Sequence, residues 1–223
     1  MIDLMPIWLS LKLAFSTTLL LLLIGLPMAY LLSKWQSLGK TLVESLITLP
    51  IILPSTVMGF YLLLAFSPES WLGNLLQTVG ISLPFSFAGM LIASLIYNLP
   101  FMVQPIQRGF EEIPKQYWQI AYTLGKSKTE TLFRVVLPNM KRALLTGVIL
   151  TFAHTIGEFG IILMIGGNIP GVTKVASLAI YSDLEAMNYQ AAHTYSLILL
   201  ITSVLIIFLL NLINQLKVQH AVR

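Results

Sequence analysis

The sequence contains no cysteine, and few of its residues carry a charge. Of 223 residues, 10% are charged and 57% are hydrophobic, whereas roughly 25% of the residues of a typical soluble domain are charged. The absence of cysteine excludes a disulfide framework and thiolate metal ligands. The shortage of charged side chains excludes a soluble protein, because too little polar surface is available to face water. The sequence therefore predicts an integral membrane protein.

Several motifs of catalysis and cofactor binding are also missing. The chain has no G-x-x-x-x-G-K-[ST] phosphate loop, no HExxH or GxSxG pattern and no close pair of carboxylates in its apolar segments. The N-terminal segment lacks a basic region and a small-residue cleavage site, so we expect no cleavable signal peptide. We therefore expect a chain that is not an enzyme and binds no metal or cofactor. A polytopic membrane enzyme using His154, Glu158 or Asp183, and a secondary transporter, remain as alternatives.

Five apolar segments are long enough to cross a bilayer, which takes ~20 residues of helix. Irregular backbone cannot face lipid, and the segments lack the alternation of barrel strands, so helices are expected. The fold class predicted is therefore all-α, with one domain over residues 1–223. Gly157, Glu158 and Gly160 interrupt the fourth segment. The expected spans are residues 8–32, 42–66, 85–103, 143–165 and 192–216.

The positive charges predict the orientation of these spans. Alternate loops together with the C-terminal tail hold 11 of the 13 Lys and Arg residues. Positively charged loops stay in the cytoplasm, so we expect the N-terminus outside and the C-terminus in the cytoplasm. Paired prolines in the second and third spans predict kinked helices around a cavity, because each proline removes a backbone donor. The pairs are Pro50 with Pro54, and Pro100 with Pro105.

The largest polar segment is the expected cytoplasmic loop, residues 108–134. A short helix is predicted to start at Ile113 and Pro114 and to end at Gly125, and a second to start at residue 127. Tyr117, Ile120, Ala121 and Leu124 share helical spacing and form an apolar edge. The composition alone is also consistent with a simpler role, in which the positive charges of this loop only fix the orientation of the chain in the membrane.

The spacing within this loop resembles the "EAA" loop of ABC-importer permeases, E-A-A-x3-G-x9-I-x-L-P. In that family the loop contacts a separate ATPase. The chain departs from the pattern because Gln119 replaces the acidic residue and Ile120 the first alanine. The resemblance implies an ATPase-coupling role for Gln119, Ala121, Gly125, Val135, Leu137 and Pro138.

Two glycine-containing elements, GEFG at residues 157–160 and GNIPG at residues 167–171, resemble elements of molybdate-importer permeases. We expect Glu158 to be protonated or hydrogen-bonded rather than a ligand for an anion, with His154 as its nearest partner. A metal site at this pair would lack further ligands. Exposed backbone donors at 168–171 would suit an oxyanion, and an ordinary turn is the alternative. The implied pathway or gate residues are Gly157, Glu158, Phe159, Gly160, Asn168, Pro170 and Gly171.

The resemblance also implies how such a chain would work. Two copies would form an oxyanion pore in the inner (plasma) membrane of a prokaryote, in contact with lipid and without nucleic acid. A cytoplasmic ATPase dimer would bind ATP and Mg²⁺, and a periplasmic or lipid-anchored binding protein would deliver the oxyanion. Molybdate is the expected cargo, and tungstate or sulfate and thiosulfate are the alternatives.

Overall fold

The computed structural model describes residues 3–219, except for the side chains of residues 209, 210 and 213–219. Within that range the chain forms helices and connecting turns and no strand, which confirms the predicted all-helical class. In chain order the helices are α1 (Met5–Lys34), α2 (Leu38–Ile52), α3 (Ser55–Phe66), α4 (Trp71–Thr78), α5 (Phe87–Glu112), α6 (Lys115–Thr123), α7 (Lys128–Thr131), the π-helix η1 (Leu132–Val136), α8 (Leu137–Asn139), α9 (Lys141–Ile156), α10 (Gly160–Gly166), α11 (Ala176–Glu185) and α12 (Tyr189–Gln219).

Three of these helices are long and apolar enough to cross a membrane alone: α1, α5 and the part of α12 over Tyr189–Phe208. The described chain reaches five spans only if two bent pairs each count as one. One pair is α2 with α3, where the chain bends by 113°. The other is Lys128–Asn139 with α9, where it bends by 73°. The predicted number of five is therefore the upper limit of what the helices allow.

Three of the predicted spans have clearly different bounds in the structure. The third, α5, continues to Glu112, so residues 108–112 belong to this helix rather than to the predicted loop. The second breaks at Leu53 and Pro54, because a residue before proline favours extended backbone and Leu53 has ψ 137°. The fourth was wrong in its C-terminal third: α9 ends at Ile156, and α10 begins only at Gly160. The second proline pair does not break its helix, since Pro100 and Pro105 both lie inside α5.

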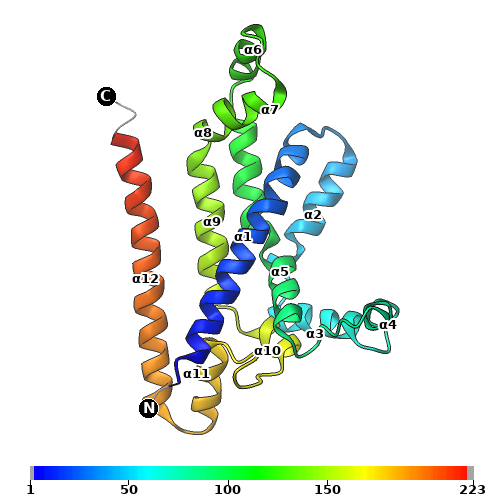
Figure 1. The fold of residues 1–223 in the computed structure, drawn as a ribbon, viewed down its shortest axis with the longest axis vertical. Helices are drawn as coiled ribbons and strands as arrows, with labels where there is room; N and C mark the ends of the chain where they lie inside the picture. The colour runs from blue at the N-terminus through cyan, green and yellow to red at the C-terminus, as the bar shows by residue number, and fades with distance from the viewer. Residues whose placement is uncertain (1–2, 220–223) are drawn as a thin grey trace.

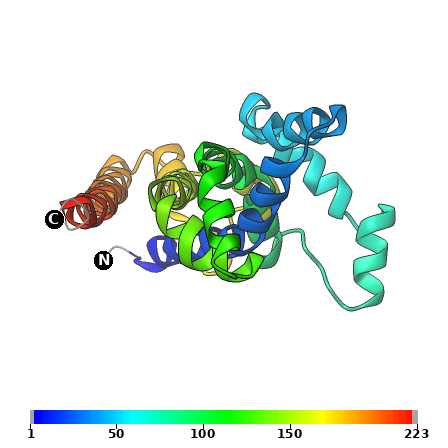
Figure 2. The ribbon, with the colours of Figure 1, turned by 90° about the horizontal axis from the view of Figure 1, so that it is seen from above.

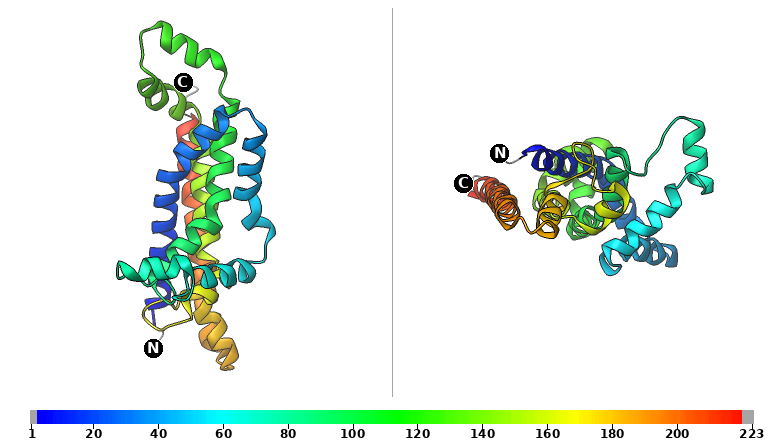
Figure 3. Two further views of the ribbon diagram at one scale, coloured as in Figure 1. Left: turned by 90° about the vertical axis from the view of Figure 1, so that its right-hand side faces the viewer. Right: turned by 90° about the horizontal axis from the view of Figure 1, so that it is seen from below.

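The long helices α1, α5 and α9 pack together at the centre of the molecule (Figure 1). The helices α6 and α7 lie at one end, beside the C-terminal ends of α1 and α5, while α3, α4, α10 and α11 lie at the other. Figures 2 and 3 show α12 on one side of the central helices, and α2, α3 and α4 projecting on the other. The C-terminal residues 220–223, including Arg223 of the charge argument, lie outside the described residues.

Close approach of the central helices depends on small residues, as is usual where lipid gives no hydrophobic drive for association. A Cβ on Gly109 of α5 would lie 2.5 Å from the Cβ of Ala143 of α9. The described core consists of two buried apolar clusters, of which the second adjoins this contact. One contains Leu13, Met90, Ile161 and Leu178, and the other contains Leu21, Met102, Ile106 and Val136.

Candidate functional site

The helix α6 and the turn after it form a compact hairpin with α7, which we call the polar hairpin (residues 114–131). Pro114 precedes α6, and Gly125 follows its last turn with φ +74°, as predicted. The Lys126 amide donates to the carbonyl of Ala121 at 3.0 Å and closes the helix end. No atom would lie within 4 Å of a Cβ on Gly125, so the backbone conformation rather than space requires glycine.

The second short helix begins as predicted at Ser127, whose hydroxyl accepts a hydrogen bond from the Glu130 amide at 3.2 Å. The Glu130 carboxylate pairs with Lys126 at 2.7 Å and with Arg134 at 3.1 Å. These contacts tie the turn to the chain that follows it.

The predicted loop residues beyond the polar hairpin lie at its junction with α9. Val135 and Leu137 are partly buried, and Pro138 is exposed. The fully buried residue here is Val136, which belongs to the apolar cluster around Met102. Val136 directly follows Val135, which occupies the β-branched position of the loop motif. The spacing of the motif does not predict that Val136 is the buried residue.

Trp118 fixes the polar hairpin to the rest of the protein, and the sequence analysis missed it. Its side chain is buried, its ring centroid lies 6.1 Å from that of Tyr30, and the Lys34 ammonium lies 4.6 Å from its centroid. Tyr30 in turn packs against Phe110 at 5.3 Å. Trp118 lies three residues before Ala121 on the same helical face, but this spacing does not say which face of the helix is buried.

The apolar edge predicted for α6 is divided between two faces. Ala121 is 4% exposed and faces inward with Trp118, whereas Tyr117, Ile120 and Leu124 are 43%, 60% and 72% exposed. Gln119 is also exposed. Three large apolar side chains on one exposed face at the polar end of a protein are typical of a contact surface for another protein.

At the other end of the helix bundle, the two helix breaks meet. A Cβ on Gly160 would overlap the hydroxyl of Ser55 and lie 3.1 Å from the Thr56 amide, so only glycine permits this contact. Gly157 differs, because a Cβ there would meet only the carbonyl of His154 at 3.8 Å. Close packing of the backbone against a neighbouring helix is therefore present at Gly160 and absent at Gly157. A pocket of about 380 Å³ lies here, lined by Ser55, Tyr97, Ala153, His154, Gly157, Glu158, Phe159 and Gly160.

Glu158 lies at this junction with its side chain 1% exposed. Its two carboxyl oxygens contact α5: Oε2 accepts from the hydroxyl of Ser94 at 2.5 Å and Oε1 from the amide of Asn98 at 2.5 Å. Its backbone carbonyl accepts from the hydroxyl of Ser177 at 2.6 Å, which attaches α11 to the same point. Phe159 packs beside Tyr181 of α11, with centroids 5.1 Å apart. Glu158 therefore connects three segments that are far apart in the sequence.

The expectation that His154 would be the nearest partner of Glu158 was wrong. Their closest atoms are 4.0 Å apart, too far for a hydrogen bond. The His154 Nδ1 atom lies 2.9 Å from Oδ1 of Asn98, whose amide nitrogen contacts Glu158. Because that oxygen can only accept, Nδ1 carries the hydrogen. Asn98 thus bridges the two residues, and helix α5 rather than a neighbouring turn of α9 binds the carboxyl group.

The turn after α10 forms hydrogen bonds within itself and to α11. Asn168 and Gly171 adopt positive φ, 57° and 75°. The Ile169 amide donates to the hydroxyl of Thr173 at 2.8 Å, and the Asn168 side-chain amide donates to Ser182. Pro170 and Gly171 are exposed. Among the described residues, the structure shows an intramolecular acceptor for the Ile169 amide but none for the backbone amides of Asn168 and Gly171, so the oxyanion cradle stays a prediction.

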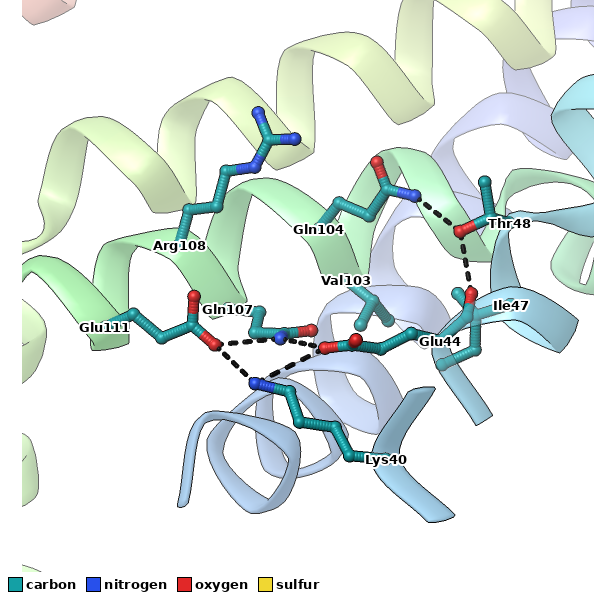
Figure 4. A pocket seen from close by; sticks show the side chains of 9 residues that line it. All are labelled: Lys40, Glu44, Ile47, Thr48, Val103, Gln104, Gln107, Arg108 and Glu111. Atoms are coloured by element: carbon teal, nitrogen blue, oxygen red, sulfur yellow. Dashed lines mark hydrogen bonds and ion pairs between the residues drawn. The ribbon is translucent and has the colours of Figure 1, made fainter. Parts of the chain in front are cut away.

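A polar network that the sequence did not suggest joins α2 to α5 near the polar hairpin (Figure 4). Lys40 lies 2.9 Å from Glu111 and 3.5 Å from Glu44, and the Gln107 amide donates to both carboxylates. A pocket of about 520 Å³ surrounds these side chains. The network attaches α2, which buries few residues, to the central helices.

A family model matches residues 21–221, and its family is described as the binding-protein-dependent transport system inner membrane component. The chain belongs to this family. One relative of the permease is the molybdenum transport system permease protein ModB of Azotobacter vinelandii, 44% identical over 209 residues, which cover 93% of this chain and 92% of the relative. The sulfate transport system permease protein CysT of Salmonella typhimurium is 35% identical over 191 residues, 86% of this chain and 69% of that protein.

Solved importer structures share the fold of this permease. A bacterial ABC transporter that imports alginate matches with a TM-score of 0.72 at 18% identity, over 93% of this chain and 78% of that one. The MetNI methionine ABC transporter matches with a TM-score of 0.69 at 18% identity, over 93% and 92%. The fold is thus that of an ABC-importer permease, as predicted.

Membership of this family decides between the classes of function. The chain is a permease subunit of an importer and not an enzyme, and it is a multi-pass inner membrane protein. The family is described as part of binding-protein-dependent transport systems, and one solved alginate transporter with this fold is in complex with a periplasmic protein. Among the described residues no group of three His, Asp or Glu side chains could hold a metal, and Asp183 does not line the pocket at Glu158.

Proposed function

We propose that the chain forms the membrane pore of a molybdate importer. The observation that carries the proposal is the 44% identity to a molybdenum permease over nearly the full length of both chains. The sulfate permeases are 30–35% identical to this chain, and the match covers only about two thirds of the length of most of them. Both cargoes are tetrahedral oxyanions, so sulfate is the second candidate, and tungstate shares the same chemistry.

The polar hairpin is proposed as the surface that the ATPase contacts. The exposed Tyr117, Ile120 and Leu124 supply an apolar contact face, and buried Trp118 anchors the hairpin to α1. ATP and Mg²⁺ would bind to the ATPase, and this chain would bind no cofactor. Nucleotide binding would then shift the pore between its inward-facing and outward-facing states.

Residues 1–223 are proposed to act as one permease domain, paired with a second copy in the membrane. Helix α2 buries only Ile47 and Pro50 in this chain, and Leu38 and Trp71 are 91% and 81% exposed. These apolar surfaces need lipid or a second copy to cover them.

The proposed orientation puts the N-terminus outside and the C-terminus in the cytoplasm. The polar hairpin lies at one end of the molecule, and α3, α4 and α10 lie at the other (Figure 1). The second end would then meet the binding protein.

Uptake by the purified importer tests this proposal. The chain, its ATPase and its binding protein are reconstituted in vesicles, and the ATP-dependent uptake of molybdate, tungstate and sulfate is compared. We expect uptake of molybdate at micromolar concentration and saturation by molybdate before sulfate. Sulfate uptake that molybdate does not inhibit would reassign the cargo, and oxyanion uptake without the ATPase would refute the mechanism.

A further inference from the structure

A second groove begins at the same end as the polar hairpin and runs between α5 and α9. It has a volume of about 450 Å³. From α5 it is lined by Phe101, Gln104 and Arg108, and from α9 by Arg142 and Leu150. Arg108 lies near the C-terminal end of α5 and Arg142 at the start of α9, so both residues are at the end of the groove nearer the polar hairpin.

Neither arginine forms an ion pair with the described residues, although carboxylates are near. Lys40 occupies Glu44 and Glu111, and the Arg108 guanidinium points away from that network (Figure 4). Glu112 also lines the groove, so the side chains of its lining carry a net charge of +1, although Arg108 also lines the pocket that holds Glu44 and Glu111. The guanidinium groups are therefore not neutralised by ion pairs within the described protein.

The other polar side chains of the groove already have partners. The Gln104 amide donates to Thr48 at 2.9 Å, and the Thr146 hydroxyl donates to the carbonyl of Arg142 at 2.9 Å. The strongest donors left to a ligand are the guanidinium groups, each with five N–H bonds in a planar fork that suits oxyanions. Both arginines are exposed, and because two guanidinium groups in lipid would be very costly, this end of the groove must open to water.

This groove adjoins the pocket where the helix breaks meet. Phe101 lines the groove and stacks on His154, with ring centroids 4.2 Å apart. His154 lines the pocket on the other side of that stack. One face of α5 and one face of α9 therefore lead from the helix breaks to the cytoplasmic end, with the two arginines at the exit.

We propose that Arg108 and Arg142 form a binding subsite for a tetrahedral divalent oxyanion at the cytoplasmic end of this groove. The site rests on the proposed function for its cargo and for the direction of transport. Two separate guanidinium groups match an anion of charge −2 with four oxygens. The subsite would hold the anion after it passes the Phe101–His154 stack and before it enters the cytoplasm.

Direct binding tests the subsite without any need for transport. The chain is placed in lipid nanodiscs and titrated calorimetrically with sodium molybdate, then with sodium sulfate, at constant ionic strength set by chloride. We expect saturable binding, weakened about tenfold by Arg108→Gln and again by Arg142→Gln. That is the lower end of what a hydrogen bond to a charged group contributes, because both side chains are exposed to water. The matched control is Lys141→Gln, which removes the same charge from the residue next to Arg142.

Each other outcome overturns the subsite. Absence of saturable binding to the unaltered chain, or equal weakening in all three variants, would show only diffuse attraction. If the arginine variants contain one copy of the chain where the unaltered protein contains two, these residues hold the two copies together instead of binding an anion. Vesicle uptake then separates this proposal from the proposed function. If the unaltered importer moves no oxyanion, the proposed function is wrong, and the titration still decides whether the subsite exists.

Discussion

Replacing Glu158 by alanine removes a buried side chain that joins α5 to the break between α9 and α10. In the structure its carboxyl group accepts hydrogen bonds from Ser94 and Asn98, and almost none of it is exposed. The alanine variant leaves both donors buried without this partner. Glu158→Gln keeps an oxygen for Asn98 and offers an amide to the Ser94 oxygen, so it preserves most of the contacts.

The expected loss follows from the two stranded donors. A buried donor that loses its partner costs about 1–3 kcal/mol, so the alanine variant should lose roughly 2–6 kcal/mol of unfolding free energy, before any cost of the cavity. Glutamine should cost about 1 kcal/mol or less, because one hydrogen bond is kept and the shape is unchanged. Neither variant carries the charge of Glu158. The difference in unfolding free energy between them therefore does not include the effect of the charge, and it reports the hydrogen bonds and the filled space.

The measurement is equilibrium unfolding of the purified chain in mixed detergent micelles, followed by helix content. Glu69→Ala is the matched control, because it removes an exposed carboxylate from the loop before α4. If Glu158→Ala unfolds at the same denaturant concentration as Glu69→Ala, the carboxyl group does not hold these helices together. A glutamine variant as unstable as the alanine variant would show instead that the stabilisation depends on the charge.

Two further predictions concern glycines. Gly125→Val should reduce copurification with the ATPase severalfold because of its positive φ, which costs a β-branched residue about 1–2 kcal/mol. Gly80→Val, with φ +76° in an outer loop, should leave copurification unchanged, and equal losses in both variants would contradict a specific role for the hairpin. Gly160→Val should abolish assembly of the purified chain, because its side chain would overlap Ser55, whereas Gly157→Ala should assemble normally. Equal assembly of these two variants, measured by gel filtration, would show that the helix breaks do not pack as described.

The polar hairpin could be predicted from the sequence because its determinants are local. Proline before a helix and glycine after it act through their own dihedral angles, so Pro114 and Gly125 set the bounds of α6. The burial of Trp118 and Val136 could not be predicted in this way. Both depend on which helices lie beside the loop, and periodicity within a nine-residue helix does not give its orientation.

The partners of Glu158 could not be predicted for a related reason. Helical spacing puts His154 four residues before Glu158, and this suggests a direct pair. The helix ends at Ile156, so the expected geometry is lost. Ser94 and Asn98 lie about 60 residues away, and only the packing of α5 against the helix break brings them to the carboxyl group.

Helix α5 gives a physical route between the two ends of the permease. At 26 residues it is about 39 Å long, and its N-terminal half carries Ser94 and Asn98, which bind Glu158. Its C-terminal end is joined to α6 by Ile113 and Pro114 alone, and the ring of proline fixes one of the backbone angles of that link. Displacement of the polar hairpin must therefore move the end of α5. The hydrogen bonds to Glu158 would transmit that movement to the junction of the two helix breaks.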